Sequence, residues 1–93
     1  MLINLEKTIE KCLVDEVKKQ GGLALKLVSP GMNGLPDRLI LMPNGKMAFV
    51  EVKAPGKKPR PLQVARHEIL RQLGFKVYVL DDVKEIGGII DEI

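Results

Sequence analysis

The 93-residue chain is poor in aromatic residues and in cysteine, and each scarcity excludes a class of protein. Phe49, Phe75 and Tyr78 are its only aromatic side chains, so we expect contact with backbone phosphates, rather than base stacking, if the partner is a nucleic acid. The single cysteine, Cys12, excludes an internal disulfide and is typical of a reducing, intracellular setting. No apolar run is long enough to span a membrane, and a charged amphipathic segment follows the first residues directly, which argues against a secretory signal.

Hydrophobic residues make up 45% of the chain and charged residues 29%, which indicates one globular domain over residues 1–93 with a modest core. No repeat, low-complexity segment or linker divides the chain. The net charge of +3 is compatible with a polyanionic partner but does not require one. Composition alone therefore leaves the function open.

The spacing of apolar residues predicts an α/β fold with elements in the order α-β-β-β-α-β. We expect Asn4 to cap the first helix, in which Ile9, Leu13 and Val17 form a buried stripe bordered by Cys12 as a small buried residue. The sheet should be mixed, four-stranded and flanked by helices, because a helix and strand that return beside a hairpin form a crossover. The predicted elements are a helix over Leu5–Gln20, a mostly buried strand over Leu23–Val28, a hairpin over Asp37–Lys53, a helix over Pro61–Leu73, a strand over Phe75–Leu80, and a helical tail over Asp81–Ile93 that Gly87-Gly88 interrupts.

The second predicted helix has an apolar stripe that we expect to be buried. His67, the only histidine of the chain, lies on this helix one turn after Gln63 and is interpreted as a surface residue. The predicted stripe consists of Leu62, Ala65, Ile69, Leu70 and Leu73.

The turn of the hairpin decides which side chains share a face, since a shift of one residue moves every side chain to the other face. An asparagine–glycine pair alone suggests a two-residue type I′ turn, which would place Asp37 and Glu51 on opposite faces. Pro43 instead favours a three-residue loop over Pro43–Gly45, with the asparagine second in a type I turn and the glycine in the left-handed conformation of a bulge. Paired residue numbers then sum to 88, so Asp37 faces Glu51, and Lys53 shares their face.

Two carboxylates that face each other on an antiparallel pair repel and destabilise the sheet. A divalent cation between Asp37 and Glu51 would remove that cost. Hard oxygen ligands without a Cys/His cluster point to Mg²⁺ or Mn²⁺ rather than zinc, and such an ion could activate water and hold a phosphate beside Lys53. On the hairpin alone, an ordinary turn with surface charges remains the simpler interpretation.

Four short motifs follow one another in order: Ser29-Pro30-Gly31, Gly34-Leu35-Pro36-Asp37-Arg38, Phe49-Val50-Glu51-Val52-Lys53-Ala54-Pro55-Gly56 and Pro61-Leu62-Gln63. Together they make the chain resemble the VRR-NUC domain, a branch of the PD-(D/E)xK nuclease superfamily. The resemblance runs from about residue 9 to residue 80 and implies a stand-alone, minimal domain with the restriction-endonuclease-like core.

The resemblance implies a metal-dependent endonuclease that hydrolyses phosphodiester bonds of DNA, with branched DNA such as a Holliday junction or a flap as substrate and without an organic cofactor. It further implies that Asp37, Glu51 and the Val52 carbonyl bind Mg²⁺ or Mn²⁺. Lys53 would orient the attacking hydroxide and balance charge in the transition state. A phage-encoded protein is a typical source of such a domain.

Two helical positions also gain roles from the resemblance. A glutamate of the first helix approaches the metal in this family, directly or through water, and Glu10 fits that pattern better than Glu6, whose place in the first turn is already explained by the helix dipole. Gln63 matches a glutamine that contributes to placing the water or the lysine near the metal.

The segment Ala54–Arg60 is basic and too rich in proline for a helix or a central strand. Together with Arg38, it supplies the expected phosphate contacts Lys57, Lys58 and Arg60. Two other functions stay open: a nucleic-acid-binding module without turnover, and a nuclease of linear DNA or RNA.

A symmetric homodimer is expected, because cutting a four-way junction productively requires two incisions at related positions and a two-fold dimer presents two equivalent sites. Apolar residues at the two ends of the chain are the candidate contacts, although they could instead cap the domain's own sheet. These residues are Leu2, Ile3, Ile89, Ile90 and Ile93.

Overall fold

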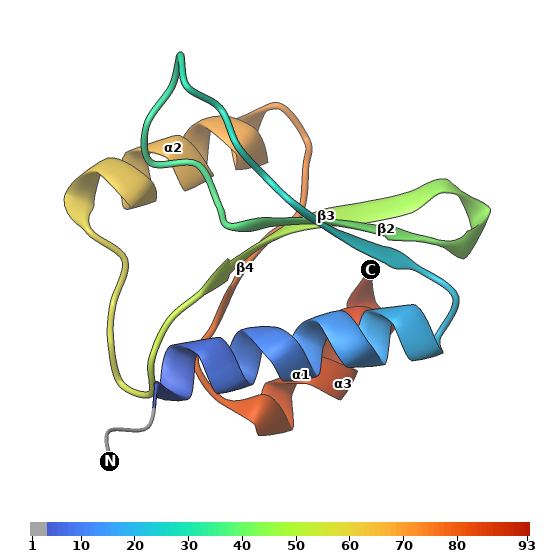
Figure 1. The fold of residues 1–93 in the computed structure, drawn as a ribbon. Helices are drawn as coiled ribbons and strands as arrows, with labels where there is room; N and C mark the ends of the chain where they lie inside the picture. The colour runs from blue at the N-terminus through green and yellow to red at the C-terminus, as the bar shows by residue number, and fades with distance from the viewer. Residues whose placement is uncertain (1–3) are drawn as a thin grey trace.

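A computed structural model of the chain describes residues 4–93. In that range the helices and strands follow the predicted order α-β-β-β-α-β, with one further short helix at the end (Figure 1). The elements are α1 (Leu5–Lys19), β1 (Leu23–Lys26), β2 (Arg38–Met42), β3 (Lys46–Val52), α2 (Pro61–Gln72), β4 (Val77–Leu80) and α3 (Ile86–Glu92). None of the helices within residues 4–93 is long and apolar enough to cross a membrane.

The four strands form one mixed sheet in the order β1-β2-β3-β4. β1, β2 and β3 are antiparallel neighbours, whereas β4 returns through α2 and pairs parallel to β3. Figure 1 shows α1 and α3 on one face of the sheet and α2 on the other. The predicted mixed, four-stranded sheet flanked by helices is therefore confirmed.

The hairpin has the predicted register, because Leu39 pairs with Phe49 and Met42 with Lys46, so that paired numbers sum to 88. The three-residue connection Pro43–Gly45 is also confirmed. The predicted type I turn is wrong in one detail: Asn44 has φ 69° and ψ 27°, so it shares the left-handed region with the following glycine. Asparagine tolerates this region better than most residues, so the loop keeps its length and the register is unaffected.

The hydrophobic core lies between the sheet and the α1–α3 layer. Asn4 begins α1, since its side-chain oxygen accepts a hydrogen bond from the Lys7 backbone at 3.0 Å, and the predicted stripe Ile9, Leu13 and Val17 is buried. Full burial of each such aliphatic side chain contributes roughly 1.5–3 kcal/mol. The remaining core side chains come from the strands and from α3, and they are Ile40, Ala48, Val50, Val52, Leu80, Ile86, Ile89, Ile90 and Ile93.

Two predictions of burial in the first half of the chain are wrong. Leu23 and Leu25 of β1 are 59% and 43% exposed, because β1 is the edge strand and their partners Leu41 and Leu39 alternate with the core residue Ile40, which places them on the face opposite to the core. Strand β1 also ends at Lys26 rather than Val28. Cys12 is exposed rather than buried, since it lies beside the inward stripe of α1 rather than on it.

Helix α2 contradicts its predicted orientation. Its buried residues are Gln63 and His67, whereas the predicted apolar stripe mostly faces outward. The helix lies over the charged end of the hairpin, and a buried carboxylate there requires hydrogen-bond donors from whatever covers it. The exposed members of the stripe are Leu62, Ala65, Ile69 and Leu73, and Leu70 is half-buried.

The C-terminal tail is helical, but Gly87 and Gly88 lie inside α3 and do not interrupt it. The isoleucines Ile89, Ile90 and Ile93 are 6–7% exposed and belong to the chain's own core. Of the two roles left open for these three residues, their burial supports capping of the chain's own sheet rather than a dimer contact. The other two predicted contacts, Leu2 and Ile3, lie outside the described residues.

Candidate active site

Asp37 stands where the loop 27–36 returns to the sheet, and both neighbouring strands fix it. The Leu27 backbone donates a hydrogen bond to the Asp37 carbonyl at 2.9 Å, and the Val52 backbone donates one to Asp37 Oδ2 at 2.8 Å. Pro36 before it is fully buried. The Asp37 side chain thus takes the place of a backbone acceptor at the end of the β2–β3 ladder.

The loop before Asp37 is held against α2 by a glycine. Gly34 has φ +86°, and a Cβ built on it would lie only 2.9 Å from Leu62 Cγ. The Arg66 side chain adds a hydrogen bond from Nε to the Asn33 carbonyl at 3.0 Å. Only glycine allows this backbone conformation and this close approach together, so the loop and α2 form one support for the site.

Glu51 lies opposite Asp37, one position beyond the Arg38–Val50 pair in the observed register. The residue is only 1% exposed although it sits among charged groups. Oε2 accepts a hydrogen bond from Gln63 Nε2 at 2.9 Å and forms an ion pair with Lys53 Nζ at 3.1 Å. Oε1 has no hydrogen-bond partner among the described residues.

Burial raises the pKa of the Glu51 carboxyl above its usual value, and the negative charge of Asp37 raises it further. The hydrogen bond and positive charge of Lys53 act in the opposite direction, and the charge of Glu6 adds a smaller upward contribution. The net effect is upward, so the carboxylate is held in an environment that disfavours its own charge. A cation at this place would relieve that cost.

Lys53 is fixed at both ends. Its backbone donates to the Leu80 carbonyl of β4 at 2.9 Å, while its ammonium group meets Glu51 and remains 15% exposed. The predicted cluster of two acids and one lysine on a single face is therefore present in the structure.

Gln63 connects the cluster to the basic loop. Its side-chain oxygen accepts a hydrogen bond from the Arg60 backbone at 2.8 Å, and its nitrogen donates to Glu51. Its amide can make both bonds in only one orientation. Gln63 therefore contacts Glu51 directly. Its expected role in placing the water or the lysine stays a prediction.

His67 is a site residue that the sequence does not reveal, since its pattern indicates a surface position. Its side chain is buried, and Nε2 lies 3.9 Å from Glu51 Oε1. Burial lowers the pKa of the imidazole, with further lowering by the charges of Arg71 and Lys53 against a smaller opposite effect of Asp37. The only available signal is its spacing of four residues from Gln63, which puts both side chains on one face of α2.

Glu10 and Arg38 lie outside this cluster and pair with each other. Arg38 Nε meets Glu10 Oε2 at 2.9 Å, and its guanidinium also donates to the Ala24 carbonyl at 3.1 Å. Arg38 shares the face of its partner Val50, which is the core face and opposite to that of Glu51. In this structure the pair joins α1 to the sheet, and the expectations that Glu10 approaches the metal and that Arg38 contacts DNA stay predictions. The reserve choice, Glu6, is the α1 acid whose charge reaches Glu51.

The donors on the α2 face fit a hard divalent cation. Asp37 and Glu51 bring two carboxylates together, and the Val52 carbonyl belongs to the residue between Glu51 and Lys53. A buried carboxylate oxygen without a partner is the kind of ligand that Mg²⁺ or Mn²⁺ would complete. No group of three His, Cys, Asp or Glu side chains converges within residues 4–93.

The basic loop is exposed beside this site. Lys57, Lys58 and Arg60 line it, and Gly56, with φ +78°, donates from its backbone to Asp81 Oδ2 at 3.3 Å. A hydrogen bond from the Lys57 backbone to the Ala54 carbonyl at 3.0 Å closes a turn there. The three basic side chains are thus available to a polyanion.

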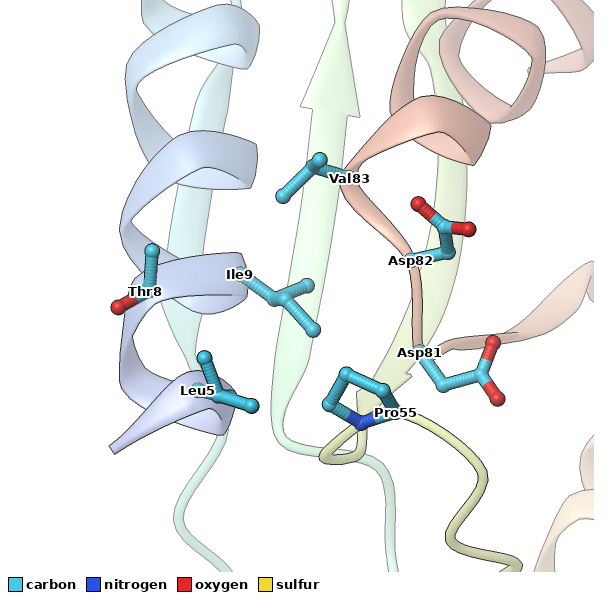
Figure 2. A pocket seen from close by; sticks show the side chains of 7 residues that line it. All are labelled: Leu5, Thr8, Ile9, Pro55, Asp81, Asp82 and Val83. Atoms are coloured by element: carbon cyan, nitrogen blue, oxygen red, sulfur yellow. The ribbon is translucent and has the colours of Figure 1, made fainter. Parts of the chain in front are cut away.

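A separate pocket of about 350 Å³ lies between the first turn of α1, Pro55 and the segment before α3. Figure 2 shows the side chains of Leu5, Ile9 and Val83 gathered in it, while the carboxylates of Asp81 and Asp82 point away from Ile9. Asp82 Oδ1 accepts a hydrogen bond from the Lys84 backbone at 2.9 Å and so caps the short 3-10 turn that precedes α3. None of the cluster residues lines this pocket, and we assign it no chemistry.

Comparison with known proteins gives matches in family, sequence and structure. The family model of the VRR-NUC domain matches residues 3–83. A protein of Acyrthosiphon pisum secondary endosymbiont phage 1, p44, which is named as a nuclease, is 59% identical over 76 residues, or 82% of this chain and 82% of that protein. A solved structure described as a VRR_NUC domain has a TM-score of 0.89 and 34% identity, and the match covers 96% of this chain and 97% of that one.

Proposed function

The chain belongs to the VRR-NUC domain family, and from this premise we propose that it is a nuclease that hydrolyses phosphodiester bonds of DNA with the help of Mg²⁺ or Mn²⁺. The observation that carries the proposal is the cluster of Asp37, Glu51 and Lys53 on one face, in which burial and the charge of Asp37 raise the pKa of the Glu51 carboxyl. Such a site is costly to the metal-free fold, which favours a function that uses it.

The ion would be held by Asp37, Glu51 and the Val52 carbonyl, with Glu6 near it through water. When bound, it would act as a Lewis acid and lower the pKa of water. Lys53 carries the positive charge that would offset negative charge developing on the phosphate oxygens as the ester bond breaks. Gln63 holds the Glu51 carboxylate in place while this happens.

The substrate backbone would reach the site along the basic loop, where Lys57, Lys58 and Arg60 lie. Their contacts would go to phosphates and so carry no base information. Selectivity would then come from the shape of the DNA, which supports branched DNA as the substrate. The likeness to p44 supports a phage or prophage origin.

The active form would be a two-fold homodimer, because one domain of this size offers one cluster and a junction needs two cuts. The apolar stripe of α2 is the surface that supports it: Leu62, Ile69 and Leu73 are 45%, 42% and 67% exposed. A stripe along one helix can pack against its own copy about a two-fold axis and bury side chains that this chain leaves in water.

Cleavage of a labelled four-way junction tests the proposed activity. We expect nicked products with Mn²⁺ or Mg²⁺, none with EDTA, and weaker cutting of flap, linear duplex, single-stranded DNA and RNA in the same panel. Junction binding without product in either metal would contradict the proposal and indicate a binding module. Equal cutting of linear substrates would contradict only the selectivity for branches.

Light scattering of the free protein at micromolar concentration tests the dimer. We expect the mass of two chains for the unchanged protein and of one chain for Ile69→Glu. Val64→Glu is the matched control, because Val64 is 52% exposed on the same helix but lies off the stripe. A monomer that still cuts both strands in one binding event would contradict the assembly.

A further inference from the structure

His67 and Glu51 face each other with one unpaired atom each. The atoms are His67 Nε2 and Glu51 Oε1, 3.9 Å apart, and they are the buried side-chain nitrogen and oxygen without a hydrogen-bond partner in residues 4–93. Both side chains are 2% exposed. Buried polar atoms in folded proteins are nearly always paired, so two such atoms opposite each other indicate an interaction between them.

The burial of His67 restricts what it can do. With Nε2 shielded from solvent, the ring cannot touch a phosphate or exchange a proton with substrate. Its position behind the carboxylate, on the helix that also provides Gln63, is that of a support.

The protonation of the ring decides the sign of the interaction. A neutral imidazole carries its proton on one nitrogen, and the other presents a lone pair. A lone pair on Nε2 would face the carboxylate oxygen and repel it, whereas an Nε2–H group would donate to that oxygen. The Nε2 tautomer is the one that this geometry stabilises.

We propose that His67 is a positioning residue of the active site. A small approach of the two side chains would close the 3.9 Å gap between Nε2 and Glu51 Oε1 to hydrogen-bond distance, so that Nε2–H donates to this oxygen and fixes the carboxylate from behind. Helix α2 then supplies two donors one turn apart, Gln63 to Oε2 and His67 to Oε1. With each oxygen held from its own side, the carboxylate cannot rotate, and its remaining lone pairs keep one direction. The inference rests on the proposed function insofar as these lone pairs serve a metal ion.

The ring proton can be located directly, because His67 is the only histidine of the chain. Nitrogen-15 NMR of the imidazole in the metal-free protein should show a proton on Nε2. In Glu51→Gln, the amide oxygen should turn to the two donors Gln63 and Lys53, so that its NH₂ group meets Nε2 and the ring proton moves to Nδ1. An Nδ1 proton in the unchanged protein would overturn the proposal, as would an unmoved proton in the variant.

Adding Mg²⁺ separates a support from a ligand. A positioning residue keeps its Nε2 proton when the ion binds, whereas a direct ligand must lose it. Loss of that proton would overturn the proposal.

Calorimetric titration with Mn²⁺ measures how much His67 contributes to the affinity of the site for the ion. His67→Phe fills the space without a donor and should weaken Mn²⁺ binding by roughly 10- to 100-fold, the usual effect of losing a residue that orients a metal ligand. His67→Gln restores a donor and should recover most of the affinity. On junction DNA, His67→Phe should lower kcat with little change in KM, because the ring does not reach the surface.

Unchanged Mn²⁺ affinity in a folded His67→Phe protein would overturn the proposal. If the unchanged protein itself binds no Mn²⁺, the proposed function fails, but the tautomer of the metal-free protein still decides whether His67 donates to Glu51. If His67→Phe does not fold, the NMR measurements on the unchanged protein still show whether the ring proton is on Nε2, as the proposal requires.

Discussion

The two faces of the sheet are filled by different kinds of side chain. On the α1–α3 face, Ile9, Leu13 and Val17 pack on Ile40 and Val50, and every member of this core is apolar. On the α2 face, the fully buried side chains include a carboxylate and an imidazole, and two of their atoms have no partner within residues 4–93. The same sheet thus carries an ordinary core on one side and a polar cluster on the other.

This difference separates stability from chemistry. Burial of the apolar face is favourable at every position, whereas the polar face holds Glu51 with a raised pKa beside another acid. The chain can tolerate that unfavourable site because the opposite face supplies the stabilisation. Substitutions on the α2 face should therefore reduce cleavage with little loss of stability, and substitutions on the core face should reduce stability with little loss of cleavage per folded molecule. Four experiments test this comparison.

The largest effect is expected on the α2 face. Asp37→Asn, Glu51→Gln and Lys53→Ala should each lower the cleavage rate on the order of a thousandfold or more, because each removes a charge that acts in the transition state. Junction binding should remain, and circular dichroism should show the fold unchanged. Lys46→Ala at the exposed tip of the same hairpin is the matched control and should cut normally. Full activity of Asp37→Asn would contradict the assignment of the site.

The opposite pattern is expected on the core face. Leu13→Ala should lower the free energy of unfolding by about 2–5 kcal/mol, because Leu13 is completely buried and its removal leaves a cavity. Urea unfolding measures this, and the kcat per folded molecule below the transition should not change. A specific loss of kcat in the folded variant would show that the two faces are coupled.

The basic loop should change binding rather than stability or chemistry. Replacing Lys57, Lys58 and Arg60 by alanine should weaken DNA binding equally for all sequences and lower the salt slope by roughly one unit for each phosphate interaction removed. A double alanine variant at Lys18 and Lys19, at the far end of α1, is the control. An unchanged slope in the triple variant would show that the loop does not touch DNA.

The smallest expected effect is a gain in stability when the Glu51 carboxylate on the α2 face is neutralised. In the metal-free protein, Glu51→Gln should raise the free energy of unfolding by about 1 kcal/mol at neutral pH, the ordinary size of a single-residue effect, while it abolishes cleavage. Because the folded pKa of Glu51 is raised, its contribution is most favourable below the unfolded pKa and is lost as pH rises through the folded pKa. Urea unfolding across this range should show the unchanged protein losing stability with pH and the variant losing less. A variant that is less stable than the unchanged protein throughout would contradict a costly Glu51.

The backbone order and the hairpin register can be predicted because they depend on local residues. Pro43 and the glycine after Asn44 select a three-residue loop, and the register then places Asp37 opposite Glu51 without knowledge of the rest of the fold. The buried stripe of α1 can also be predicted from its own segment, because its apolar residues all lie on one face of the helix and that face is the buried one.

The orientation of α2 cannot be predicted in the same way. Its apolar stripe and its polar pair Gln63 and His67 lie on different faces, and hydrophobicity alone favours burial of the stripe. A carboxylate that must be covered reverses the choice, and that requirement comes from a strand distant in the sequence. The pairing of Glu10 with Arg38 cannot be predicted for the same reason, because it depends on how α1 crosses the sheet.

The Gln63 amide has a consequence for how this small domain could sense its substrate. Its oxygen accepts a hydrogen bond from the backbone of Arg60 in the basic loop, and its nitrogen donates one to the Glu51 carboxylate. If the basic loop moved when it bound a phosphate, Arg60 would move with it. The planar amide of Gln63 would pass this movement to Glu51. A single side chain would then link occupation of the loop to the position of the carboxylate.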